Sequence, residues 1–128
     1  MKKSQVFNYY ENSTGLPQGG DTTFVGVLPC GISDLDGLFD ALSSTLSLPE
    51  YFGANWNALS DCLRDFHWLK EVIIVLVHEE VPRLPGDDLW EYLDILCECI
   101  KDWGGSEEHQ FRVMFPEHGR QQISDILD

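Results

Sequence analysis

The sequence predicts a single α/β domain built around a small parallel β-sheet. Two observations carry this prediction: β-branched and aromatic segments occur at residues 22–29, 71–78 and 109–116, and amphipathic helical segments separate them. Strands that alternate with helical crossovers are typical of parallel sheets, and each crossover is right-handed. At 128 residues, a folded chain buries roughly two-thirds of its unfolded surface, which is enough for one core.

The chain begins with a segment of low regularity. Residues 1–20 show no sustained apolar periodicity and are predicted to form an irregular arm or an edge extension, whereas residues 21–128 are predicted to form the single domain. The next segment, TTFVGVLP at residues 22–29, is β-branched and aromatic and ends in Pro29. It is predicted to be the first strand of the sheet.

Two helices are expected next. Ser33 followed by Asp36 resembles a capping box, and apolar residues then recur at helical spacing until the chain reaches Pro49. A second helix is predicted over residues 55–66, with Asn55 at the cap position.

The second half of the chain repeats the strand–helix–strand order. The run EVIIVLVH at residues 71–78 is almost continuously apolar, which favours a central strand covered on both faces. Asp87 and Asp88 place negative charge at the favourable end of a third helix that stops at Gly104. HQFRVMFP at residues 109–116 is predicted to be the last strand.

Charge and composition limit the possible partners. Twenty-two acidic residues against eight basic ones give a formal net charge of −14, which disfavours nucleic acid and anionic membranes and favours solubility or a basic macromolecular partner. The longest apolar run, residues 72–77, is too short to cross a bilayer. The N-terminus lacks the apolar core of a secretory signal, and the four cysteines lack metal-site spacing, so we expect reduced thiols in a cytoplasmic protein.

The second helix combines an apolar stripe with a short-chained polar face. Leu59, Cys62, Leu63 and Phe66 fall on one side of a helical wheel, and Asp61 lies near the centre of the opposite side. That polar side also contains Asn57, Ser60 and Arg64. The loop before the helix contains Tyr51, expected at the surface, Phe52, expected in the core, and Gly53, whose missing Cβ permits a left-handed backbone. A polar outer face is common on surface helices, and an aromatic residue beside a glycine loop is also typical of interfaces.

The stretch LPEYFGANWNALSDCL, residues 48–63, resembles the binding segment of the barstar family, which comprises intracellular inhibitors of the barnase type of ribonuclease. The positions that fit the family pattern in register are Leu48, Pro49, Glu50, Tyr51, Gly53, Asn55, Ala58, Leu59, Asp61, Cys62 and Leu63. The order of strands and helices resembles the family more loosely from about residue 22 to residue 115. Residues 1–20 and 116–128 lie outside the resemblance.

The resemblance implies a three-stranded parallel sheet packed against helices, and inhibition by occlusion without catalysis or a cofactor. It implies that Asp61 occupies the place of a substrate phosphate and accepts charge-assisted hydrogen bonds from the target enzyme. Tyr51, Gly53 and Asn55 become loop contacts. Asp102, near the end of the third helix, is a candidate for a second acidic contact, and this assignment rests only on its position in the helix.

The sequence departs from the family pattern on the presumed binding face. The family has an acid where this chain has Asn57 and a tryptophan where it has Ser60. Arg64 adds a cation three residues from Asp61, at a spacing that suits an ion pair. Trp56 either replaces the missing aromatic contact or packs at the margin of the core. These departures leave the target open, because a different partner surface needs different contacts.

The sequence therefore predicts a cytoplasmic, monomeric immunity protein that inhibits a basic ribonuclease. The alternative is a binding module on the same scaffold, or an immunity protein for a different, non-ribonuclease toxin. An enzyme is not expected, because the four histidines are scattered and no phosphate-binding glycine motif is present. Asp61 and Asp65 form an i,i+4 carboxylate pair, which without a pocket is better explained as a solvated helix face.

Overall fold

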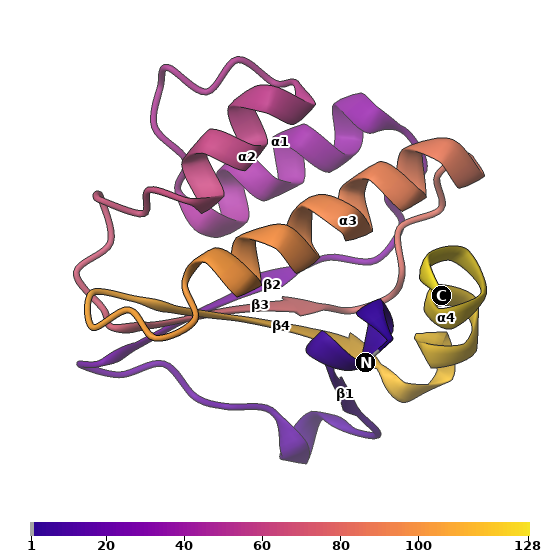
Figure 1. The fold of residues 1–128 in the computed structure, drawn as a ribbon, viewed down its shortest axis with the longest axis horizontal. Helices are drawn as coiled ribbons and strands as arrows, with labels where there is room; N and C mark the ends of the chain where they lie inside the picture. Colours follow the sequence, from indigo (N-terminus) through magenta and orange to yellow (C-terminus); the bar gives the residue numbers. More distant parts are fainter. Residues whose placement is uncertain (1) are drawn as a thin grey trace.

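A computed structural model describes residues 2–128 and shows a four-stranded, fully parallel sheet (Figure 1). The strands, in spatial order, are β1 (Asn8–Tyr10), β4 (Gln110–Pro116), β3 (Ile73–His78) and β2 (Thr23–Leu28). The expectation of three strands was wrong, because β1 adds a fourth beside β4, with Tyr9 opposite Phe115. A three-residue strand has little local signal and depends on its neighbour for stability.

The helices lie mainly on one side of the sheet. They are α1 (Leu35–Leu46), α2 (Trp56–Leu63), α3 (Gly86–Asp102) and α4 (Arg120–Leu127), with short 3₁₀ helices η1 (Lys3–Val6), η2 (Ser13–Gly15) and η3 (Glu117–Gly119). Figure 1 shows α1, α2 and α3 over one face, and the segment that joins β1 to β2 running past the other. Helix α4, which the sequence analysis did not predict, lies beside the N-terminal segment.

Helix boundaries follow local capping chemistry. The cap of α1 is Asp34 and not Ser33, since the Asp34 carboxylate accepts a hydrogen bond from the backbone N–H of Gly37 at 2.7 Å. The prediction of Asn55 as the cap of α2 is confirmed. Helix α2 is shorter than expected and ends at Leu63, because Phe66 takes a left-handed backbone conformation with φ of 48°.

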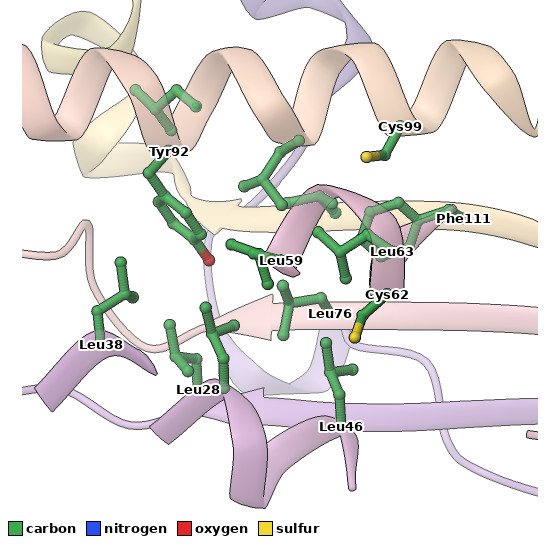
Figure 2. Packing of buried hydrophobic residues seen from close by; sticks show 14 of the residues in the cluster. Leu28, Leu38, Leu46, Leu59, Cys62, Leu63, Leu76, Tyr92, Cys99 and Phe111 are labelled. Atoms are coloured by element: carbon green, nitrogen blue, oxygen red, sulfur yellow. The ribbon is translucent and has the colours of Figure 1, made fainter. Parts of the chain in front are cut away.

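The hydrophobic core lies between the sheet and helices α1 to α3. Figure 2 shows Leu59 and Leu63 of α2 gathered with Leu76 of β3, and all three side chains are fully buried. Strand β3 is also buried on its other face, where Val75 and Val77 are only 2% and 0% exposed. The prediction of a central strand covered on both faces is confirmed.

One polar pair is sealed inside this core. The Nδ1–H of His78 donates to the carbonyl of Met114 at 3.1 Å, and Nε2 accepts from the Tyr92 hydroxyl at 2.6 Å. The imidazole also stacks on Phe115 at a centroid distance of 4.0 Å. Burial lowers the pKa of His78 to about 3, so the ring stays neutral and both nitrogens remain satisfied.

We expect this pair to make the fold sensitive to mild acid. The unfolded chain binds a proton at His78 below pH ~6.5 that the folded chain does not bind, so the free energy of unfolding falls with decreasing pH by up to about 1.4 kcal/mol per unit. Urea unfolding at pH 8, 6.5 and 5.5 measures the loss. The His78 ring resonance of the folded protein should stay at its neutral position in NMR spectra down to pH 5, and titration near pH 6.5 would contradict the assignment.

Candidate functional site

The loop before α2 is fixed to the helix by its cap residue. The side-chain oxygen of Asn55 accepts from the backbone N–H of Ala58 at 2.8 Å, and its amide nitrogen donates to the carbonyl of Gly53 at 3.2 Å. The expected left-handed residue is not Gly53 but Ala54, with φ of 51°. Gly53 matters for space instead, since a Cβ there would lie 3.2 Å from the Asn55 amide nitrogen.

The two faces of α2 are as the helical wheel predicts. Leu59, Cys62 and Leu63 are buried against the sheet, with exposed fractions of 0%, 2% and 0%. Asn57 and Asp61 are exposed on the opposite face, and Ser60 is half-buried at its margin. The buried stripe therefore determines which way the polar face points.

Asp61 lies on this exposed face with its carboxylate open to solvent. Within residues 2–128, none of the ion pairs involves Asp61. An ionised, exposed carboxylate can accept two parallel hydrogen bonds from an arginine of another molecule.

Arg64 pairs with Asp102 and not with Asp61. Its Nε lies 2.8 Å from Oδ2 of Asp102, and both side chains are about half exposed. The nearby Cys99 sulfur and then Asp102 raise the pKa of Arg64, so the guanidinium stays charged. This pair connects the C-terminal end of α2 to that of α3 and brings two of the predicted site residues together.

Trp56 packs at the margin of the core. Its ring meets Phe39 edge-on at a centroid distance of 5.1 Å and lies 6.4 Å from the ring of Tyr92. Because the side chain is half-buried, only part of its surface is available to another molecule. Of the two roles that the sequence left open for Trp56, this geometry favours packing.

As predicted, Tyr51 lies at the surface, whereas Phe52 is partly buried and packs against the core. Phe52 packs near Phe39 at 6.0 Å, whereas Tyr51 is 64% exposed. The Tyr51 ring lies parallel to the imidazole of His67, and its hydroxyl lies 3.4 Å from a carboxylate oxygen of Asp65. Sequence reasoning did not select Asp65 or His67 as site residues, because they are separated from Tyr51 by the whole of α2.

Three acidic residues along α3, Asp94, Glu98 and Asp102, each form an ion pair with a basic residue. Asp94 binds Lys3 at 2.8 Å, Glu98 lies 3.8 Å from Lys101, and Asp102 binds Arg64. The negative electrostatic potential that these three carboxylates contribute beside α2 is therefore weaker than that of three unpaired acids. Asp61 lies on the predicted binding face and takes part in none of the ion pairs found within residues 2–128.

Asp61 and Asp65 do not form the helical carboxylate pair that their spacing in the sequence suggested. Asp65 lies beyond the end of α2 and accepts from His67, so it does not share a regular helical face with Asp61. Residues 2–128 contain no cluster of three or more His, Cys, Asp or Glu side chains arranged to hold a metal ion. None of the helices described in that range has the length and apolarity to cross a bilayer.

Residues 27–116 match the family model described as Barstar (barnase inhibitor). The chain belongs to the barstar family. The matched range contains α2, the loop before it and strands β3 and β4, whereas β1 and α4 lie outside it. Members of the barstar family are inhibitors. A comparison with curated proteins found no match.

Truncating side chains on the two faces of α2 should change the free energy of unfolding by very different amounts. Leu59→Ala and Leu63→Ala should each lower the free energy of unfolding by ~2–5 kcal/mol, because each leaves a cavity beneath the helix. Asp61→Ala should change it by less than ~0.5 kcal/mol, because the side chain is exposed and unpaired. Chemical denaturation of the three variants measures both effects. Global unfolding of Asp61→Ala would make Asp61 a structural residue and contradict its place on a binding face.

Proposed function

We propose that this barstar-family protein binds a basic ribonuclease through the exposed face of α2 and the loop before it, and inhibits the enzyme by occluding its active site. The observation that carries the proposal is the Asp61 carboxylate, which is exposed, unpaired within residues 2–128, and held on a helix whose opposite face is buried. Tyr51, Gly53 and Asn55 contribute the loop side of this surface.

The proposed inhibition depends on charge mimicry. A ribonuclease binds the RNA phosphate with cationic side chains, and a carboxylate presents similar acceptor oxygens to the same groups. Asp61 occupies that place without offering a bond to cleave, so the enzyme is blocked. A helix and its preceding loop can supply roughly 800 Å² of contact, the usual share of one partner in a stable interface.

The charge of the whole molecule supports a basic target. With a formal net charge of −14, the protein attracts a cationic partner over distances longer than direct contact. Dissolved salt screens this attraction beyond roughly 10 Å. Association should therefore be faster at low ionic strength, and the pairs formed at contact should be less affected.

We also propose that the protein acts in the cytoplasm. All four cysteines are free thiols, and Cys62, Cys97 and Cys99 are buried. Burial raises the pKa of Cys97 to about 12, so its thiol is unreactive. A core that relies on buried thiols and not on disulfides suits a reducing compartment.

A second candidate is an immunity protein for a toxin that is not a ribonuclease. It is favoured by Asn57 and Ser60, which stand where the family pattern has an acid and a tryptophan. The Arg64–Asp102 pair also puts a charged guanidinium at the edge of the face. A target with a mixed-charge surface would accommodate these residues better than a uniformly cationic cleft.

Inhibition of RNA cleavage by barnase tests the proposal. The wild-type protein should suppress cleavage at micromolar excess, and Asp61→Ala should weaken suppression at least ~100-fold if a buried charge pair is lost. Asp21→Ala is the matched control, since it removes the same charge from an exposed site on the segment before β2. Full barnase activity at micromolar wild-type protein would favour the second candidate, and equal effects of the two variants would exclude a specific role for Asp61.

A further inference from the structure

The chain reverses direction sharply after α2. Phe66 adopts φ of 48°, a conformation that is costly for a bulky residue. Its ring is fully buried and packs near Phe111 and Trp103, at centroid distances of 5.2 and 6.1 Å. The aromatic contacts around Phe66 therefore hold the strained turn in place.

This reversal places the two residues beside Phe66 against the loop that precedes α2. The Nδ1–H of His67 donates to Oδ2 of Asp65 at 2.7 Å, and the same oxygen lies 3.4 Å from the hydroxyl of Tyr51. The His67 and Tyr51 rings are parallel within 4°, with their centroids 6.4 Å apart. This offset arrangement is favourable for aromatic pairs.

All three side chains are at the surface, and Asp65 lies within hydrogen-bonding distance of both the Tyr51 hydroxyl and the His67 imidazole. Tyr51 is 64% exposed, and the side chains of His67 and Asp65 are 60% and 43% exposed. Slight desolvation, followed by the Asp65 carboxylate, raises the pKa of Tyr51, so its hydroxyl keeps the proton that it donates. The imidazole of His67 lies beside the Tyr51 ring and parallel to it.

We propose that Asp65 and His67 are positioning residues of the partner-binding surface, which hold the ring of Tyr51 in the orientation that it presents to the partner. This inference rests on the proposed function of the α2 face. Asp65 bridges the hydroxyl and the imidazole, and His67 supports the ring. The other end of the loop is fixed by Asn55, whose amide donates to the carbonyl of Gly53.

We call this arrangement of Asp65 and His67 around Tyr51 the clamp. It improves binding because the Tyr51 side chain loses less conformational freedom when the partner binds. An exposed tyrosine on a free loop samples several rotamers, and binding would have to select one of them. A ring already held by His67 and Asp65 loses less freedom on contact. Rigid aromatic side chains are effective at interfaces for this reason.

The clamp is tested first in the free protein. In NMR spectra, the Tyr51 ring resonances should move away from their wild-type positions in His67→Ala, because the ring current of the imidazole is lost. In His67→Phe they should remain near their wild-type positions, because the variant retains a stacking ring. His118→Ala, at an exposed histidine of η3, is the control and should leave Tyr51 unchanged. Tyr51 resonances that are the same in His67→Ala and wild type would overturn the clamp.

Barnase inhibition then tests the positioning role. His67→Ala should weaken inhibition about two- to tenfold, the contribution expected of one aromatic pair, and His67→Phe should restore it. If His67→Ala shifts the Tyr51 resonances but inhibits barnase as well as the wild-type protein does, the positioning role is overturned. If wild-type protein does not inhibit barnase, the proposed function fails, and the Tyr51 resonances of the free protein still decide whether the clamp exists.

Discussion

The buried stripe of α2 is the constraint on which the candidate site depends. Leu59 and Leu63 have no exposed surface, so the helix cannot rotate about its axis without opening the core. Because side chains on a helix have fixed angular positions, burying these two leucines points Asp61 toward solvent. The cap at Asn55 sets where the helix begins, and so fixes the loop relative to the same face. The same orientation of α2 therefore buries Leu59 and Leu63 and exposes Asp61.

Within the described part of the chain, ion pairs neutralise several acidic side chains of α3 but do not involve Asp61 on α2. Cations on the surface are mostly engaged with neighbouring acids, as in Lys3–Asp94, Lys101–Glu98 and Arg64–Asp102. Exposed pairs of this kind contribute little to stability. They do remove local charge, which leaves Asp61 as a carboxylate available to another molecule. With a formal net charge of −14, the surface as a whole stays negative, and Asp61 adds a specific anion, unpaired among the described residues, on the exposed face of α2.

Periodic features were predictable from the sequence, and features that depend on distant contacts were not. The stripe of α2, its cap and the doubly buried strand β3 follow from local spacing of apolar and polar residues. Strand β1 has three residues and exists through pairing with β4, so its local sequence carries no strong signal. Neither the left-handed turn at Phe66 nor the pairing of Arg64 with Asp102 has a local pattern, because each depends on packing against α3 or β4.

The central claim is that the Asp61 carboxylate takes the place of an RNA phosphate in the enzyme. Its most direct test is competition between this protein and a 3′-mononucleotide for barnase, followed by calorimetry. The account predicts that the apparent dissociation constant of the protein rises in proportion to the nucleotide concentration, because the two ligands exclude one another. An apparent dissociation constant that is independent of the nucleotide, or a ternary complex, would contradict it.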